Sequence, residues 1–423
     1  MKIIKQNTLL KVLSLNSISV AVSFVLGIFS SKIVSVFLGT SGMAMIGSLR
    51  NFTTMLKSMS TLGINNSLVK LFVENKEDKN ELSIIYSTFF WLFFSISAIL
   101  GVLVFLFSNA ISNFLFFKNS FAIPIQVFGI SLPLIVINAF WLAIYNGLEK
   151  FKKIVIIQII SNLLVFIIST YLIWKHQIFG GLLAIALGEV MMVFVTFVFV
   201  RKELNFFQFN LQKTISKKHV KVIQNFSIMA LLTAVIAPLS LIFIRNLIVS
   251  KLSIETAGLW DATNRLSVFY MMFFNTGLSL YYMPKLASLK SDDEFKAELK
   301  SYFSFLVPLF FVMLLIIFFL RSYIINTAFT NEFKEINSLL IWQMLGDFFR
   351  IVTLAFGFQI VVKMMIRKYF IIEIIFNGCY FLFSYFLIDV FKISGVLQAY
   401  FYSNLISFFI VIIMFRNLFY KYK

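Results

Sequence analysis

The stretch Phe121–Trp174, FAIPIQVFGISLPLIVINAFWLAIYNGLEKFKKIVIIQIISNLLVFIISTYLIW, decides the fold of this chain. It holds two long apolar runs, which are separated by a short basic segment around Lys150. About 20 apolar residues are enough for a helix to cross the hydrocarbon core of a bilayer. The stretch therefore predicts two membrane-spanning helices joined by a short loop.

The same pattern continues from Leu9 to Tyr420 and predicts an all-α polytopic membrane protein. Of its 423 residues, 60% are hydrophobic and only 13% are charged, about half the charged share of a soluble protein. The mean hydropathy is +0.93. Twelve spans are predicted, at 8–38, 42–72, 82–108, 121–147, 154–174, 180–200, 222–249, 256–284, 301–320, 336–362, 366–388 and 393–415.

The longest stretch without an apolar run, about Arg201–Lys221, lies near the midpoint of the chain. We therefore expect two bundles of six helices around a central cavity. The N-terminal bundle would cover 1–205, a cytoplasmic linker 206–221, and the C-terminal bundle 222–423. Because six is even, both halves would enter the membrane in the same direction, as in a parallel repeat. The tetrapeptides at 40–43 (TSGM) and 256–259 (TAGL) are a short echo of such a repeat.

Basic residues predict the orientation of the spans. With the N-terminus inside, 24 Lys and Arg residues lie in cytoplasmic segments and 6 in the opposite loops. Lys and Arg are retained on the cytoplasmic side, so we expect both termini in the cytoplasm. Topology also accounts for the net charge of +19, and we expect no nucleic-acid partner.

Six further basic residues lie inside or at the ends of the predicted spans, where a charge usually faces a bundle interior or a wet cavity. They are Lys32, Arg50, Lys57, Arg245, Arg265 and Arg350. Arg50 and Lys57 are two helical turns apart on one face, with no acid in their span, which favours cavity lining. Lys32 and Arg245 lie near span ends, and snorkelling to the interface is an equal alternative for them. The set predicts a path for an anionic substrate.

Four acids accompany these cations in the spans: Glu189, Asp261, Asp347 and Glu373. Asp261 and Arg265 are four residues apart, and Asp347 and Arg350 three apart, which are helical pairing distances. For Asp347 two roles stay open: it binds and releases a proton during transport, or it holds Arg350 in place. Glu189 and Asp261 are likewise coupling or structural candidates.

Signals for an enzyme are weak. His176 and His219 lie in predicted loops without metal-ligand spacing, and Cys379 is the single cysteine. There is no phosphate-binding Walker sequence. We therefore expect a chain that is not an enzyme and has no catalytic residue, metal or cofactor. A membrane glycosyltransferase or ligase is the alternative from another class.

Three stretches carry a resemblance to a known family. They are Val36–Lys70 with FLGTSGMAMIGSLRNF, Phe226–Leu289 with FSIMALLTAVIAPLSLIFIRNLI, and Asn331–Ser403 with IWQMLGDFFRIVTLAFGFQIVVKMMIRKYFIIEI. They resemble the O-antigen and enterobacterial common antigen translocases. These are Wzx-type lipid-linked oligosaccharide flippases of the multidrug/oligosaccharidyl-lipid/polysaccharide exporter superfamily. The resemblance covers nearly the whole chain, and IWQMLGD is its most specific part.

The resemblance implies a flippase of the bacterial inner membrane. Such a protein moves undecaprenyl-diphosphate-linked oligosaccharide from the cytoplasmic to the periplasmic leaflet by alternating access. Membrane lipid surrounds it, and a polysaccharide polymerase and a chain-length regulator are the protein partners that the resemblance suggests. Arg50, Lys70, Arg245 and Asp347 look like matches to charged family positions, whereas Lys57 and Arg265 look particular to this chain.

A multidrug exporter of the same superfamily is the main alternative. Such exporters commonly carry a coupling carboxylate in the first helix, and the first predicted span here has no acid. A peptidoglycan-precursor flippase is closer in substrate but normally has more spans.

Overall fold

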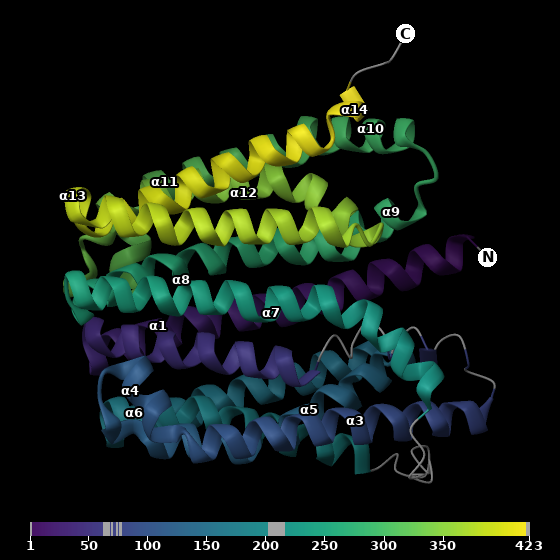
Figure 1. Cartoon of the computed structure of the whole chain (residues 1–423), viewed down its shortest axis with the longest axis horizontal. Coiled ribbons are helices and arrows are strands. Elements are labelled where there is room, and N and C mark those ends of the chain that lie inside the picture. The colour runs from purple at the N-terminus through teal and green to yellow at the C-terminus, as the bar shows by residue number, and fades with distance from the viewer. Residues whose placement is uncertain are drawn as a thin grey trace. The chain divides into compact units, whose positions relative to one another are not determined.

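The computed structural model of the chain describes residues 2–61, 68, 71–72, 75, 78–201 and 216–419, and most of these residues lie in helices. No β-strand occurs among these residues. The predicted all-α fold class is confirmed. The helices are drawn in Figure 1.

The elements in the described part of the chain are α-helices and short 3₁₀- or π-helical segments. In chain order they are α1 (Lys2–Thr61), α3 (Lys79–Leu106), α4 (Ser108–Phe116), η1 (Asn119–Phe121), α5 (Ala122–Gly147), α6 (Phe151–Val200), α7 (Lys217–Lys251), α8 (Ile254–Gly277), η3 (Leu278–Tyr282), α9 (Met283–Ser288), α10 (Asp292–Ser301), η4 (Tyr302–Leu306), α11 (Val307–Ala328), η5 (Asn331–Phe333), α12 (Ile336–Val362), α13 (Ile366–Met414) and α14 (Arg416–Phe419).

Three of the long helices are broken in the middle. The breaks lie at Gly39 in α1, at Gln177 in α6 and at Lys392 in α13, and each break residue has a positive φ. Each residue lies between two predicted spans. Glycine takes this backbone region at no steric cost, whereas a glutamine or a lysine there is uncommon and must be held by its surroundings.

The breaks in α6 and α13 have the same construction. Gln177 has φ 52° and ψ −133°, and Lys392 has φ 54° and ψ −135°. Three residues after each break stands a glycine, Gly180 or Gly395, with no room for a side chain. A Cβ would lie 1.9 Å from the carbonyl oxygen of Leu172 in the first case and 2.3 Å from that of Leu387 in the second. The sequence agrees, because 178–184 (IFGGLLA) and 393–399 (ISGVLQA) share Ile, Gly, Leu and Ala at the same spacing. This match supports an internal repeat more strongly than the tetrapeptides at 40–43 and 256–259.

Eight helices in the described part of the chain are long and apolar enough to cross a membrane. The three breaks divide α1, α6 and α13, so these helices supply eleven segments. The remaining predicted span corresponds to α8, which is not among the eight. Its sequence carries Glu255, Asp261 and Arg265 as well as several hydroxyl residues, and this lowers its hydropathy.

The chain divides into two compact units. One comprises Met1–Leu38 and Met45–Pro238, and the other comprises Gly39–Ala44 and Leu239–Lys423. Most of the predicted linker 206–221 lies outside the described residues, as does Lys70. The predicted bundle limits, 1–205 and 222–423, stay a prediction.

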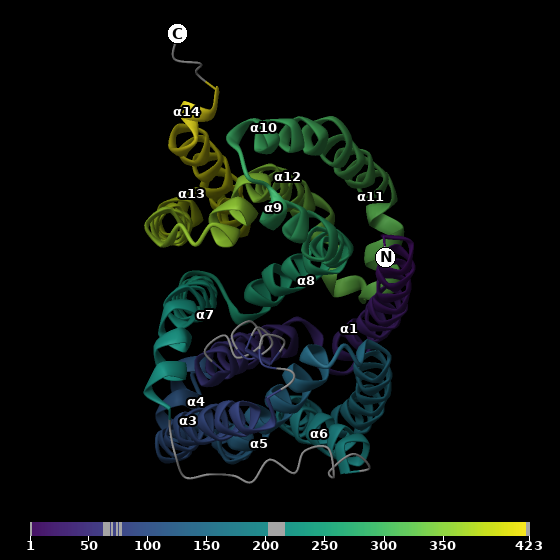
Figure 2. The same ribbon diagram turned by 90° about the vertical axis from the view of Figure 1, so that its right-hand side faces the viewer.

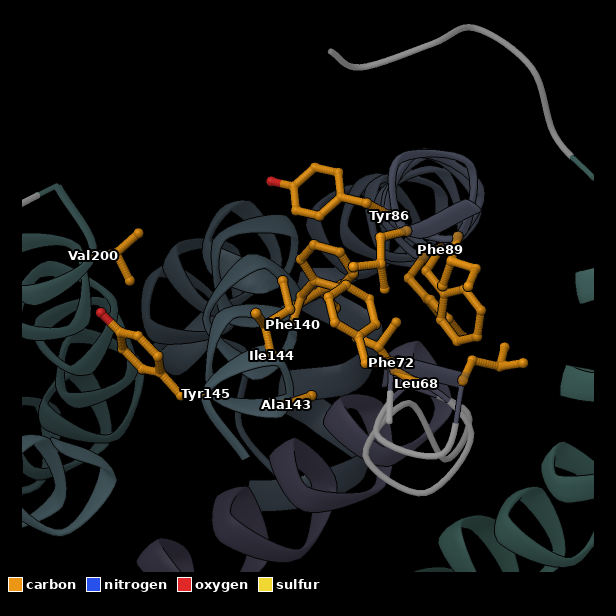
Figure 3. Packing of buried hydrophobic residues seen from close by; sticks show 14 of the residues in the cluster. Leu68, Phe72, Tyr86, Phe89, Phe140, Ala143, Ile144, Tyr145 and Val200 are labelled. Carbon is orange, nitrogen blue, oxygen red and sulfur yellow. The ribbon is translucent and has the colours of Figure 1, made fainter. Parts of the chain in front are cut away.

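An aromatic cluster forms part of the core of the first unit, where α5 packs against both α3 and α6. Phe89 and Phe140 are buried, and the ring of Tyr86 meets that of Phe140 edge to face at a centroid distance of 4.8 Å (Figure 3). Edge-to-face aromatic pairs add to the stabilisation from packing alone. This cluster holds α3, α5 and α6 together, and α6 carries Glu189.

Helix α12 is central to the second unit, and α13 packs along it (Figure 2). Two short π-helical segments, η3 and η4, each contribute a buried tyrosine that contacts the backbone of α12. Tyr282 Oη donates to the carbonyl oxygen of Ala355 at 3.0 Å, and Tyr302 Oη donates to that of Ile351 at 2.9 Å. These bonds hold one face of α12 in place.

The break in α13 gives a prediction on stability. Gly395→Ala should lower the free energy of unfolding by roughly 2 kcal/mol, because the new Cβ would collide with the Leu387 backbone. The loss is measured as a lower thermal unfolding temperature of the purified protein. Gly378→Ala on the same helix is the matched control, since nothing lies within 4 Å of its added Cβ. Equal unfolding temperatures for the two variants would show that the close approach at Gly395 is unimportant.

Candidate functional site

The carboxylate of Asp347 on α12 is fully buried and is surrounded by hydrogen-bond donors. Its Oδ2 accepts hydrogen bonds from Ser267 Oγ at 2.6 Å and from Tyr270 Oη at 2.5 Å, both on α8. Its Oδ1 accepts one from Tyr400 Oη of α13 at 2.8 Å. The amide of Gln343, one turn before it on α12, lies 3.4 Å from Oδ2. Such donors offset the cost of removing a carboxylate from water.

Arg350 lies less than one turn beyond Asp347, but its side chain is exposed. The part of the chain that the structure describes contains no ion pair between the two, so the direct pair suggested by their spacing is wrong. The Arg350 side chain is in electrostatic range of Tyr400, Asp347 and Glu373. Glu373 on α13 also accepts a hydrogen bond from Asn377 Nδ2 at 3.3 Å.

A second buried charge pair joins α7 to α8. Arg245 Nε lies 2.9 Å from Asp261 Oδ2, and the side chains are 2% and 10% exposed. The snorkelling alternative for Arg245 is therefore wrong. Asp261 therefore pairs with Arg245, sixteen residues earlier in the chain. The spacing of four residues to Arg265 had not predicted this pair. The Arg265 guanidinium lies 5.8 Å from the centre of the Phe269 ring.

Aromatic side chains connect α8 to the Asp347 carboxylate. Trp260, next to Asp261 on α8, donates from Nε1 to Tyr380 Oη at 3.1 Å. The rings of Tyr380 and Tyr400 then meet edge to face at 5.4 Å. Contacts between side chains therefore run through the second unit from Trp260, by way of Tyr380 and Tyr400, to Asp347.

In the first unit, Lys57 on α1 forms an ion pair with Glu189 on α6. The distance from Nζ to Oε1 is 2.5 Å, and both side chains are partly buried. Glu189 is thus not a lone acid, and Lys57 is not an uncompensated lining charge. Arg50 lies two turns earlier on α1 and is exposed, whereas Lys32 is half-buried.

Sequence reasoning missed the neutral members of these networks. Ser267, Tyr270 and Tyr400 each donate to Asp347, and Gln158 and Asn162 of α6 make hydrogen bonds with Ser19 and Ser23 of α1. Hydroxyl and amide residues are common in helices and carry no signal by themselves. Only the match between 178–184 and 393–399 could have been found in the sequence.

The residues that the structure describes form no metal centre. Among these residues, no three His, Cys, Asp or Glu side chains are grouped so as to hold a metal ion. His176 is exposed next to the break in α6, and the His219 side chain lies outside the described residues. The predicted roles of the charged residues in binding and coupling stay predictions.

Charged and hydrogen-bonded side chains inside membrane-crossing helices are typical of a membrane transporter, and solved structures share this fold. Lipid II flippase MurJ in an inward closed conformation has a TM-score of 0.76 at 17% identity, covering 95% of this chain and 87% of that one. An inward-facing MATE family transporter of the MOP superfamily has a TM-score of 0.72 at 13% identity, covering 96% of each chain. The fold is therefore that of MOP superfamily transporters, multi-pass proteins of the membrane.

A family described as "Polysaccharide biosynthesis protein" matches residues 33–338, more than half of the chain, and the chain belongs to that family. The Lipid III flippase of Escherichia coli (strain K12) is 22% identical over 383 residues, which is 90% of this chain and 92% of that protein. The Lipid III flippase of Shigella flexneri matches to the same extent. The expected relation to lipid-linked flippases of this superfamily is confirmed, as is the prediction that the chain is not an enzyme.

The buried pair of α7 and α8 gives a prediction on stability. Arg245→Ala should destabilise the protein by roughly 3 kcal/mol, because it removes the guanidinium that pairs with the Asp261 carboxylate in a buried position. The double variant with Asp261→Ala should lose less than the sum of the two single losses. Thermal unfolding of purified protein measures these effects.

Lys251→Ala is the matched control for this measurement. Lys251 lies on the same helix and pairs with Asp389 at 2.6 Å, but Asp389 is 63% exposed. An exposed pair contributes about 1 kcal/mol or less. A loss for Arg245→Ala as small as for Lys251→Ala would contradict the importance of the buried pair.

Proposed function

We propose that this protein is a flippase for undecaprenyl-diphosphate-linked oligosaccharide, the precursor of an O-antigen or a related surface polysaccharide. In this proposal it works in the bacterial inner membrane and carries the lipid-linked unit from the cytoplasmic to the periplasmic leaflet by alternating access. Membership of the polysaccharide biosynthesis family supports the substrate class, and so do relatives named as flippases for lipid II and lipid III. A polysaccharide polymerase and a chain-length regulator are proposed as its partners in the membrane.

The observation that carries the proposal is the exposure of one arginine within an apolar membrane helix of each unit. Arg50 lies on α1 and Arg350 on α12, and both side chains are exposed. A charged side chain at this depth cannot be left in hydrocarbon at low cost, so it faces water, protein or a polar ligand. A lipid-linked diphosphate is such a ligand, because it needs cationic donors when its polar head leaves bulk water.

Arginine is suited to this role for a geometric reason. Its planar guanidinium can donate two parallel hydrogen bonds to the oxygens of one phosphate, which a lysine ammonium cannot do. We therefore assign head-group binding to Arg50 and Arg350. Lys32 and Arg265 join them as candidate binding residues. Lys57 and Arg245, each held by an acid, support the helices on which they stand.

Both termini are proposed to be cytoplasmic, from the 24-to-6 asymmetry of basic residues across the membrane. Reporter fusions at Lys217 and Asn331 should then report opposite sides, cytoplasm for Lys217 and periplasm for Asn331. The same compartment at both positions would show that the number of spans between them is wrong.

The role of Arg50 is tested by substitution. Arg50→Ala should slow transport of a fluorescent prenyl-diphosphate-linked sugar in reconstituted vesicles by about tenfold or more, because a charge-assisted contact to phosphate is lost. Arg50→Lys should recover only part of the rate, because the bidentate fork is missing. Lys118→Ala removes an exposed charge outside the candidate membrane helices. It should transport like the unchanged protein.

Two outcomes would contradict the proposal. A full rate in Arg50→Ala would remove this residue from the substrate path. A protein that exports organic cations and does not translocate the prenyl-diphosphate-linked sugar would instead favour the multidrug-exporter alternative. Because the vesicles contain no sugar nucleotide, a glycosyltransferase would show no activity in this assay.

A further inference from the structure

We propose that Glu373, in the membrane-crossing helix α13, is a proton-binding carboxylate that exchanges its proton during the transport cycle. It takes up a proton from water on one side of the membrane and returns it to water on the other. An O–H bond forms and then breaks, and nothing is oxidised. The inference rests on the proposed function for the cargo that moves in exchange, whereas the proton site itself stands on a comparison of the two units.

The position of Glu373 is defined by the internal repeat. The match between 178–184 and 393–399 is the end of a longer one. The segments 151–162 (FKKIVIIQIISN) and 366–377 (IRKYFIIEIIFN) lie at the same separation along the chain and share one lysine, four isoleucines and the final asparagine. The first part of α6 and the first part of α13 therefore correspond residue by residue.

The backbone supports this correspondence. Glu149 and Met364 stand at matching places just before the two helices, and both have positive φ, 57° and 51°. A positive φ is uncommon for residues other than glycine, so its occurrence at both places is a shared feature of the two loops. In this alignment Glu373 takes the place that Gln158 has in the first unit.

In the first unit this position joins two helices. Gln158 Oε1 accepts a hydrogen bond from Ser19 Oγ of α1 at 3.1 Å. One turn further along α6, Asn162 Nδ2 donates to Ser23 Oγ of α1 at 2.9 Å. Hydrogen bonds between polar side chains stabilise the packing of membrane helices. The neutral amide at this position therefore has a structural role.

The second half of the chain lacks the hydroxyl groups for such bonds. The segments 33–35 and 248–250 are both IVS and lie at the same separation as the helices above, so α7 is the counterpart of α1. This alignment places Ala234 and Pro238 where α1 has its two serines, and neither side chain has a hydroxyl group. The acid of α13 therefore has no serine partner of the kind that its counterpart amide has.

The contacts of Glu373 leave its charge able to change. Asn377 Nδ2 donates to the Glu373 backbone carbonyl at 2.9 Å and lies 3.3 Å from Oε2, which is long for a hydrogen bond to a carboxylate. The side chain is only partly buried. The charged and titratable groups that act on it are Arg350 of α12 and Tyr369 of α13. Among the residues that the structure describes, loss of its charge breaks no ion pair.

The other three acids in the predicted spans have short contacts between helices. Glu189 pairs with Lys57, and Asp261 pairs with Arg245. Asp347 accepts hydrogen bonds from three hydroxyl groups of two other helices. Loss of charge at a paired acid would leave its basic partner uncompensated. Acids inside membrane helices mark proton relays in transporters, and Glu373 is the one of the four that can serve as such without disturbing these contacts.

The first experiment applies a pH difference across vesicles that contain the purified protein and a fluorescent prenyl-diphosphate-linked sugar. If one proton moves against each lipid, a difference of one pH unit should shift the lipid about tenfold toward the acidic side. Glu373→Gln should equilibrate the lipid between leaflets but show no shift. It should also fold, because the counterpart position carries glutamine. An equal shift in Glu373→Gln, or no shift in the unchanged protein, would overturn the proposal.

Two further variants separate a proton site from a general effect of acids on this helix. Asp389→Asn is the matched control, because Asp389 is also an acid of α13 but is 63% exposed and pairs with Lys251. It should keep the shift. Glu373→Asp retains a carboxylate and should retain the shift as well. Loss of the shift in Asp389→Asn as complete as in Glu373→Gln would count against a specific site.

A second measurement needs neither transport nor a variant. Dicyclohexylcarbodiimide reacts with protonated carboxyl groups in apolar surroundings, and mass spectrometry of the labelled protein reports each site separately. Glu373 should be labelled, and more so as the pH is lowered, whereas Glu189 and Asp347 should not. If this holds but the vesicles do not transport the lipid, the proposed function is wrong and the proton site is right. If Glu373 is not labelled at any pH, or no more than Glu189, the proton site is wrong whatever the cargo.

Discussion

A charge inside a membrane-crossing helix needs a counter-charge, a hydrogen-bond donor or acceptor, or water, and both units of this protein are built around that need. Asp347 is enclosed by hydroxyl groups, Arg245 is held by Asp261, and Lys57 is held by Glu189. Each of these contacts joins two different helices. The same interactions that make the charges tolerable therefore also fix the helices next to one another.

This arrangement separates two kinds of intramembrane charge. Lys57, Arg245 and Asp347 are partly or fully buried. Arg50 and Arg350 are exposed on helices that are otherwise compatible with lipid. Buried pairs are costly to break because removal of one partner leaves the other uncompensated. The proposed function assigns the exposed arginines to a ligand that binds and leaves during each transport cycle.

The chain reverses direction in the same way at the break in α6 of the first unit and at the break in α13 of the second. In α6 and in α13 a non-glycine residue with positive φ is followed three residues later by a glycine packed on a backbone carbonyl. This shared construction fits a parallel repeat. The charged sites of the two units nevertheless differ. The second unit has a buried carboxylate that accepts hydrogen bonds from two tyrosines, while Lys57 and Glu189 of the first unit form an ion pair.

The sequence by itself determined the features that depend on local composition. The length of the apolar runs predicted the membrane helices because the bilayer sets that length. The positions between runs predicted the breaks at Gly39, Gln177 and Lys392. The family resemblance also followed from continuous segments. The partners of the charges did not follow, because Lys57 and Glu189 are 132 residues apart and Tyr270 and Asp347 are 77 apart. The spacing of residues along one helix instead predicted that Asp261 pairs with Arg265 and Asp347 with Arg350. Only the tertiary structure decided these contacts, since packing of helices distant in the chain sets which side of each helix faces a partner.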